Sequence, residues 1–252
     1  MIRTIPYLLL MVGIALPVPA KETGTDVDTV HVGLFSKTDL SDITPPGWYA
    51  LEFPSIENKT AYFLTRQQDT TVVQAVSHAS ASAYFKEVDI SPRHLPILKW
   101  RWKIENVLHK SNIMSKQGDD YPARIYVSFE YDPQRLSGME RVKYKLYNLT
   151  HDRPAPLAVI NYVWGNGTAI DTIVSNAYSD RVKMIVVQND AALSKRWLTQ
   201  QRNIYQDYIK AFGEEPGRIT GIAIMTDTDN TGESVTAYYG DISFSPSAKQ
   251  VD

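Results

Sequence analysis

The feature that most constrains the fold is a strict alternation of apolar and polar residues, which two stretches show clearly. In Leu98–Ile104 (LKWRWKI), every second residue is apolar and the residues between them are cationic. Ala123–Glu130 (ARIYVSFE) alternates in the same way. Successive side chains on a β-strand point to opposite faces, so a period of two predicts strands with one buried face. We expect these two strands to pair and to bury their apolar faces together.

The rest of the chain between residues 31 and 246 repeats this pattern of short strands separated by turns. Turn-forming groups such as Thr44–Gly47 (TPPG) and Glu57–Lys59 (ENK) separate the strands. Regular short strands between such turns are typical of two packed antiparallel sheets. We therefore predict a single domain over residues 31–246. Its expected fold is all-β, an antiparallel β-sandwich of jelly-roll or galactose-binding-like type.

One segment, residues 197–212, has the spacing of a helix instead. Its residues Ile204 and Tyr208 belong to an apolar series at helical intervals. Thr199 can cap the N-terminus of such a helix, and Gly213 can end it. We expect this helix to pack on the sandwich.

The first twenty residues have the composition of an export signal. Arg3 precedes an apolar run, Tyr7–Leu16, and Val18–Ala20 supplies small residues before a cleavage point near Ala20-Lys21. The apolar run is shorter than the ~20 residues that span a bilayer, so we expect no stable membrane insertion. The predicted location is periplasmic or secreted.

Composition narrows the choice of partners. The chain has no cysteine, which excludes disulfides, thiolate metal sites and cysteine nucleophiles. Its formal net charge of −2 gives no global attraction to nucleic acid. Residues 21–30 and 247–252 show no pattern and are predicted to be tails.

Near the C-terminal end lies a turn that is rich in oxygen ligands. Asp227 and Asp229 point the same way if the preceding strand continues. With the Asn230 amide oxygen and the Glu233 carboxylate, they can supply several of the oxygens that calcium takes. The helix–loop–helix calcium motif is incomplete, because Tyr238 stands at its closing acidic position. The alternative is a purely structural turn in which these side chains cap the backbone.

The same turn is expected to close a hairpin between two strands, Ile219–Thr226 and Val235–Phe244. The apolar parity of the second strand changes after Tyr239. Such a change requires a bulge, and Gly240 is the natural place for it. The bulge would re-aim Asp241.

The polar faces of the two alternating strands carry cations. Lys99, Arg101 and Lys103 lie on the first strand, and Arg124 and Tyr126 on the second. If the strands pair, these side chains form one face that suits an anionic ligand, such as a uronic-acid sugar or a phosphate-bearing glycan. The alternative is an ordinary solvated face.

Trp100 and Trp102 have two interpretations. Their flat rings can stack on sugar rings. However, Leu98 and Ile104 share their face, which favours a place in the core.

Asp119 and Asp120 lie in the loop before the second alternating strand. With Asp227 or Asp229 they can form the pair of carboxylates that cleaves glycosides, which stand ~5–9.5 Å apart. The alternatives are turn formation and an ion pair between Asp120 and Arg124. The acidic turn takes part in ligand chemistry only if Asp119, Asp120 and Arg124 lie beside it.

Several longer stretches form a recognisable set. They are SHASASAY (77–84), LKWRWK (98–103), GDDYPARIYVSF (118–129), NYVW (161–164), residues 202–216 and residues 222–244. Together they resemble a bacterial family of exported proteins catalogued as domain of unknown function 3047. The resemblance implies no established activity. The ending YYGDISF (238–244) is also similar to the final strand of many jelly-roll carbohydrate-binding modules.

Three functions follow as hypotheses. The first is an exported non-catalytic module that binds a carbohydrate of the envelope or surroundings, or another envelope ligand. The carbohydrate can be a neutral or an anionic one. The second is a glycoside hydrolase or polysaccharide lyase that uses the paired aspartates, and the third is a structural or assembly protein. No cofactor other than calcium is expected, and neither nucleic acid nor a membrane is expected as partner. The sequence leaves the oligomeric state open.

Overall fold

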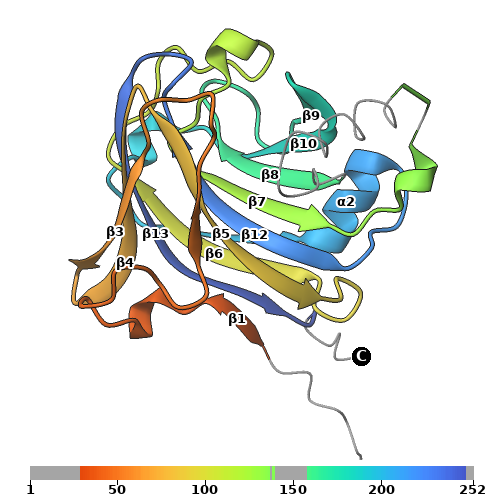
Figure 1. The fold of residues 1–252 in the computed structure, drawn as a ribbon, viewed down its shortest axis with the longest axis horizontal. Coiled ribbons are helices and arrows are strands. Elements are labelled where there is room, and N and C mark those ends of the chain that lie inside the picture. The colour runs from red at the N-terminus through yellow and green to blue at the C-terminus, as the bar shows by residue number, and fades with distance from the viewer. Residues whose placement is uncertain (1–28, 137, 140–157, 248–252) are drawn as a thin grey trace, which may run out of the picture.

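The fold of the computed structural model is a mostly-β sandwich of two sheets with a helix packed on it, which confirms the predicted fold class (Figure 1). The structure describes residues 29–136, 138–139 and 158–247. The predicted export signal, most of the N-terminal tail and most of the C-terminal tail lie outside the described residues. No helix in the described ranges is both long and apolar enough to cross a membrane.

Sheet A has the strand order β11–β6–β13–β4–β3, with β1 also paired to β13. Its strands are β1 (Val30–Gly33), β3 (Ala61–Gln67), β4 (Thr70–His78), β6 (Ile97–Ile104), β11 (Leu198–Asn203) and β13 (Ser234–Ser245). All its pairings are antiparallel.

Sheet B has the strand order β2–β5–β12–β7–β8–β10–β9. Its strands are β2 (Tyr49–Leu51), β5 (Ala81–Ile90), β7 (Arg124–Phe129), β8 (Val159–Trp164), β9 (Ile173–Asn176), β10 (Ser179–Gln188) and β12 (Ile219–Asp227). The pairing of β8 with β10 is parallel, unlike the other pairings in this sheet. The sequence predicts an antiparallel sandwich, and the structure differs from this prediction in the parallel pairing of β8 with β10.

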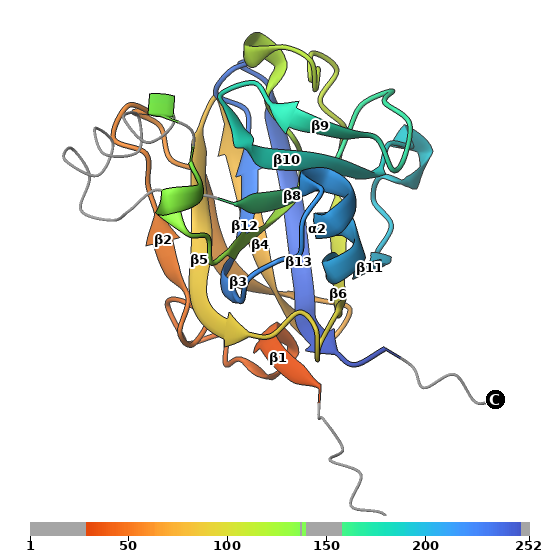
Figure 2. The ribbon, with the colours of Figure 1, turned by 90° about the vertical axis from the view of Figure 1, so that its right-hand side faces the viewer.

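Short helices occupy the connections. Among the described residues these are the 3-10 turns η1 (Phe35–Lys37), η2 (Lys116–Gly118), η3 (Pro133–Arg135) and η4 (Ala191–Leu193), and the α-helix α2 (Ile204–Phe212). Figure 2 shows α2 at the side of the sandwich, near β8 and β11.

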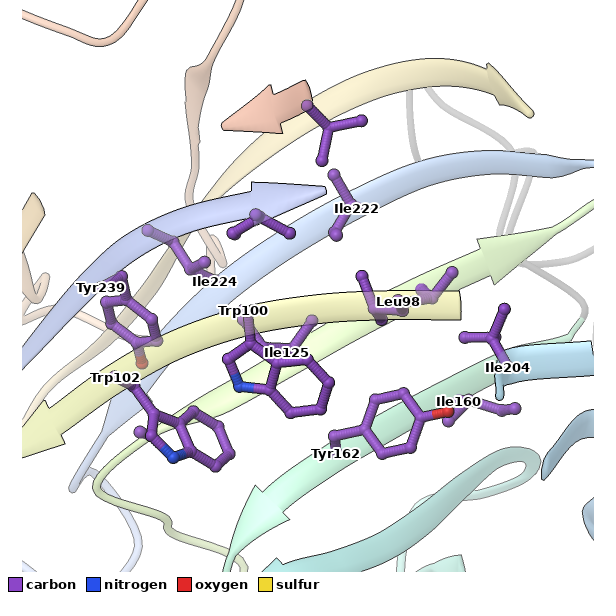
Figure 3. Close-up of a cluster of buried hydrophobic side chains, with 14 of the residues drawn as sticks. Leu98, Trp100, Trp102, Ile125, Ile160, Tyr162, Ile204, Ile222, Ile224 and Tyr239 are labelled. Atoms are coloured by element: carbon purple, nitrogen blue, oxygen red, sulfur yellow. The ribbon is translucent and has the colours of Figure 1, made fainter. Parts of the chain in front are cut away.

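The core between the sheets is built around aromatic rings. Trp100 and Trp102 are 1% and 0% exposed, which confirms the core interpretation and removes them as a sugar platform. Trp100 lies 5.2 Å from Tyr162, and Trp102 lies 6.0 Å from Trp164, between ring centroids. Figure 3 shows Trp100 and Tyr162 pointing toward one another from opposite sheets.

The predicted pairing of the two alternating strands is wrong. β6 pairs with β11 and β13 in sheet A, whereas β7 pairs with β12 and β8 in sheet B. The apolar faces of β6 and β7 do meet, but across the core. Their polar faces consequently point out of opposite sides of the sandwich.

The predicted C-terminal hairpin is also wrong, although its bulge is confirmed. β12 lies in sheet B and β13 in sheet A, so the turn between them crosses from one sheet to the other. The register of β13 against β6 shifts between Tyr239 and Ile242, on either side of Gly240. Asp241, re-aimed by this bulge, accepts the backbone N–H of Ser36 at 2.8 Å and the Ser36 hydroxyl at 2.6 Å.

The predicted helix starts too early. Residues 198–203 form β11, because their backbone pairs with the edge of β6. Helix α2 begins at Ile204, and its N-cap is Asn203, whose side chain accepts the backbone N–H of Gln206 at 3.0 Å. Gly213 ends it in the left-handed conformation, as predicted.

The position of the cap can be tested by substitution. We expect Asn203→Ala to lower stability by about 1 kcal/mol, because a helix N–H loses its acceptor. For a chain of this size, that corresponds to a melting temperature lower by roughly 2–4 °C. The matched control is Thr199→Ala on β11, which should change the melting temperature little. Equal losses from both variants would contradict the boundary.

Candidate functional site

Arg124 is the centre of the candidate site. It begins β7, faces outward from sheet B and is 2% exposed. Its Nε donates to Asp227 Oδ1 at 2.7 Å, and its Nη1 donates to the Tyr126 hydroxyl at 3.0 Å and to Asp119 Oδ1 at 3.4 Å. Its Nη2 donates to Asp227 Oδ2 and to the Asp119 carbonyl oxygen. All five N–H groups of the guanidinium therefore have an acceptor.

The path of the chain explains this convergence. Arg124 begins β7 beside the end of β12, and Asp227 is the last residue of β12. The backbone N–H of Tyr121 donates to Asp227 Oδ1 at 3.2 Å, which brings the preceding loop to the same point. Gly118 lets that loop turn tightly, since a Cβ there would lie 2.6 Å from the backbone N of Asn112.

Asp120, in the same loop before β7, binds the backbone of the acidic turn after β12. Its carboxylate is 0% exposed and accepts the backbone N–H groups of Thr231 at 2.6 Å and Asn230 at 3.3 Å. The turn is completed by Gly232, with φ +69° and its N–H bonded to the Thr228 carbonyl at 2.9 Å. Asp119, Asp120 and Arg124 thus do lie beside the acidic turn. The ion pair expected between Asp120 and Arg124 is made by Asp119 instead.

Burial controls the titration of this cluster. It raises the pKa of the Asp227 carboxyl well above its usual range, and the Arg124 guanidinium opposes that rise. Burial also raises the pKa of Asp229, and the nearby Asp120 carboxylate raises it further. For Arg124, burial lowers the pKa, but the neighbouring Asp227, Tyr126 and Asp119 outweigh it and the net shift is upward.

A cation site is suggested by three carboxylates. Asp120, Asp227 and Asp229 each offer an oxygen, and these oxygens lie within 4.8 Å of one another. Asp120 and Asp227 already accept hydrogen bonds at both oxygens. Such acidic groups occur in proteins without a metal, and calcium at this position stays a hypothesis.

The two other predicted calcium ligands point elsewhere. The Asn230 amide donates to the Tyr178 hydroxyl at 3.2 Å. The Glu233 carboxylate accepts the backbone N–H groups of His109 and Lys110, each at 3.0 Å. The predicted set of four ligands is therefore not assembled around one point.

Arg101 and Lys103 form a second group, on the outer face of sheet A. Because β6 does not pair with β7, these cations cannot share a face with Arg124 and Tyr126. The Arg101 guanidinium lies over the Trp197 ring, 4.7 Å from its centroid. The Lys103 ammonium lies 4.2 Å from the centroid of the Tyr238 ring.

Sequence reasoning missed the two rings of this second group. Trp197 had been assigned to a helix, which hid its place just before an edge strand. The parity of β13 places Tyr238 on the outer face, and the register with β6 places it opposite Lys103. That parity was readable in the sequence, but the pairing of β13 with β6 was not.

A family model described as protein of unknown function (DUF3047) matches residues 46–243. No curated protein matches the chain. Among solved structures, a family 30 carbohydrate-binding module is similar with 11% identity and a TM-score of 0.39, over 90% of this chain and 91% of the module.

Two glycoside hydrolases are also similar. A β-1,2-glucanase from Parabacteroides distasonis has 9% identity and a TM-score of 0.42, over 86% of this chain and 25% of the enzyme. The glycoside hydrolase domain of Endo-D from Streptococcus pneumoniae R6 has 7% identity and a TM-score of 0.30, over 79% of this chain and 21% of that one. The chain thus spans a quarter or less of these enzymes. At such TM-scores the similarities are distant and carry no argument about function.

The Arg124 cluster makes a sharp stability prediction. Arg124→Met leaves Asp227 buried without its cation, which we expect to lower the free energy of unfolding by roughly 3–5 kcal/mol at pH 7. Denaturant unfolding measures the change. The matched control is Arg218→Met, which breaks an exposed ion pair with Asp89 and should cost less than about 1 kcal/mol. Similar losses for both variants would contradict a special role for Arg124.

Asp229 makes a prediction about pH. A carboxyl whose pKa is raised by folding destabilises the fold when it ionises, so the penalty grows above the unfolded pKa of ~3.9. It is complete above the folded pKa. In the presence of a chelator, Asp229→Asn should therefore raise the melting temperature at pH 7, and the gain should vanish below pH ~3.9.

The control for this measurement is the exposed Asp42→Asn, which should change little at either pH. A loss of stability from Asp229→Asn at pH 7 would contradict the prediction. Repeating the melts with calcium tests the metal hypothesis, which requires a rise for the natural chain that Asp229→Asn reduces.

Proposed function

Because the chain belongs to the DUF3047 family, whose description assigns no function, we propose its function from its own geometry. It is an exported, non-catalytic module that binds carbohydrate on the outer face of sheet A.

The observation that carries the proposal is a row of side chains across four strands. Lys103 on β6 lies opposite Tyr238 on β13, Tyr238 lies opposite Gln74 on β4, and Gln74 lies opposite Phe63 on β3. Opposite residues in antiparallel strands project from the same face. The row therefore holds a cation, an amide, the phenol of Tyr238, which is 8% exposed, and the ring of Phe63, which is 43% exposed.

Trp197 and Arg101 extend this row toward β11. The Trp197 ring is half-buried and lies 6.4 Å from Tyr238, between ring centroids. Aromatic rings present apolar surfaces to the faces of sugar rings, and amide and cationic groups reach the hydroxyls. The exposed ring of Phe63, the half-buried ring of Trp197 and the adjacent polar groups together give this face the elements that bind a sugar chain.

The charges on this face favour an acidic ligand. Lys103 is already paired with Glu105 at 3.0 Å. In the described part of the chain, no carboxylate pairs with Arg101 or with the exposed Lys99. A uronic-acid unit could supply that missing anion.

The arrangement of the acids argues against the hydrolase or lyase alternative. A glycosidase needs two carboxyls that reach the substrate. Here Asp120 and Asp227 are 0% and 2% exposed, and their oxygens are held by backbone N–H groups and by Arg124. Asp119 is bonded to Arg124 as well. These acids tie the loops to sheet B, so we assign them a structural role.

Binding to a glycan array tests the proposal. We expect the purified chain to bind at least one uronic-acid polysaccharide. Trp197→Ala should weaken that binding roughly tenfold or more, because a stacking surface is lost. The matched control is Tyr178→Ala, which removes a 60% exposed ring between β9 and β10 and should leave binding unchanged.

Arg101→Ala separates the ligand classes. It should weaken binding to acidic polysaccharides more than to neutral ones, and the difference should shrink as salt is raised. A uniform absence of glycan binding would overturn the proposed function and favour the structural role. Location is tested separately, by finding whether the expressed chain loses its first twenty residues on export.

A further inference from the structure

Arg101, on the outer face of sheet A, is a half-buried arginine whose guanidinium has no hydrogen-bond acceptor among the described residues. Arg202 is also half-buried, but it donates to Asp207 and Asp171. Partial burial removes water from a charged group, and that loss is costly unless acceptors replace the water. Because Arg101 stays partly exposed, a ligand can reach its N–H groups and supply the acceptors.

Gly240 on β13 provides the space in which the Arg101 side chain lies. A Cβ at position 240 would lie 2.5 Å from Arg101 Cγ and 2.9 Å from Arg101 Cδ. Non-bonded carbon atoms prefer about 3.5–4.0 Å. The stem of Arg101 therefore lies directly against the backbone of β13. Any residue larger than glycine at position 240 would displace it, and close approach of this kind is a reason for a glycine within a strand.

Trp197 holds the other end of the same side chain. The Arg101 guanidinium lies over the Trp197 ring, 4.7 Å from its centroid. The ring attracts the cation through its π-electrons and occupies no carboxylate or carbonyl acceptor. Arg101 is thus held at two places, along its stem by Gly240 and at its head by Trp197. A side chain that is already held loses less conformational entropy when it binds a ligand.

The bulge of β13 also directs its own carboxylate to another partner. Asp241 follows Gly240, and its two oxygens accept the backbone N–H and the hydroxyl of Ser36. Arg101 makes no ion pair in the described part of the chain. A carboxylate paired with Arg101 would occupy the donors that an acidic ligand needs. The bulge therefore leaves Arg101 fixed in place and unpaired.

The chemistry of a guanidinium matches a carboxylate in shape as well as in charge. Its planar fork can present two parallel N–H groups to the two carboxylate oxygens. Lys103 is engaged by Glu105 at 3.0 Å and by the Gln67 amide oxygen at 2.9 Å. The exposed Lys99 adds positive charge but has no fork. Among these three cations, Arg101 is the one that can recognise the geometry of a carboxylate.

We propose that Arg101 binds the carboxylate of a uronic-acid unit through two of its N–H groups, and that Gly240 determines this specificity by holding Arg101 in place. The inference rests on the proposed carbohydrate-binding function and specifies its class of ligand. Gly240 is a positioning residue, because it acts through Arg101.

Nuclear magnetic resonance of the arginine side chains tests the contact directly. The full chain is labelled with ¹⁵N-arginine, and the Nε–H signal of Arg101 is identified by its absence from Arg101→Lys. The probes are oligomers of galacturonate, glucuronate and mannuronate. Their methyl esters are the matched comparators, since they keep the sugar rings and lose the charge. We expect at least one acid to shift the Arg101 signal in a saturable way, and its ester to leave the signal unmoved.

Variants separate the charge of Arg101 from its geometry and its position. Arg101→Lys keeps the charge and should weaken the responding acid roughly tenfold or more, because the fork is lost. Gly240→Ala should weaken the same acid by a similar factor. In an Arg101→Ala background, Gly240→Ala should cause no further loss, since both changes remove one contact. A further loss in that background would show that Gly240 acts on the fold instead, and would overturn its positioning role.

The results distinguish this inference from the function on which it rests. Binding of glycans without any response of the Arg101 signal would overturn the inference and leave the binding function of sheet A in place. Equal responses to an acid and its ester, or natural affinity in Arg101→Lys, would do the same. Arg101→Lys decides the carboxylate contact even if Gly240→Ala does not fold. Absence of binding to every glycan would overturn both the inference and the function.

Discussion

The guanidinium of Arg124 is the interaction on which one end of the sandwich depends. It joins three segments that are distant in sequence: the start of β7, the end of β12 and the loop that carries Asp119. Asp120, the next residue of that loop, fastens the turn from β12 to β13. One cation and its acids thus determine where the chain passes from sheet B to sheet A. Removing it would leave several buried carboxylate and carbonyl groups without partners at once.

This arrangement explains why a cluster that resembles an active site is better understood as a support. Buried ion pairs contribute little net stability compared with apolar packing, but they are costly to break. They therefore specify one arrangement of the loops more than they strengthen it. The ligand surface that we propose is the outer face of sheet A, and the two outer faces differ in chemistry. Sheet A carries the exposed Phe63 ring, the half-buried Trp197 ring and the cations Lys99 and Arg101, which pair with no carboxylate among the described residues, whereas the outer face of sheet B is largely buried.

The sequence was informative about strands and faces because both depend on local pattern. The alternation in Leu98–Ile104 placed Trp100 and Trp102 in the core, and the change of parity after Tyr239 located the bulge. Pairing could not be inferred in this way, because alternation says which side of a strand is apolar and not which strand lies beside it. The strands β6 and β7 were therefore placed in one sheet when they face each other across the core.

The errors at the candidate sites have similar physical causes. Helical spacing and strand pairing compete in residues 197–203, and the long-range bonds to β6 decide the outcome. The sequence made ligand chemistry at the acidic turn conditional on Asp119, Asp120 and Arg124 lying beside it, and only the fold shows that they do.

The central place of β13 in sheet A has a consequence for the order in which the molecule forms. This strand separates β6 from β4 and also pairs with β1, and Asp241 near its end bonds to Ser36, 205 residues earlier. A ribosome makes β13 after every other strand of the sandwich. Until then β4 and β6 lack their common neighbour, and sheet A stays open. Contacts of such long sequence separation form slowly. If the chain is exported, as its first twenty residues predict, sheet A would thereby stay open for translocation until β13 has been made.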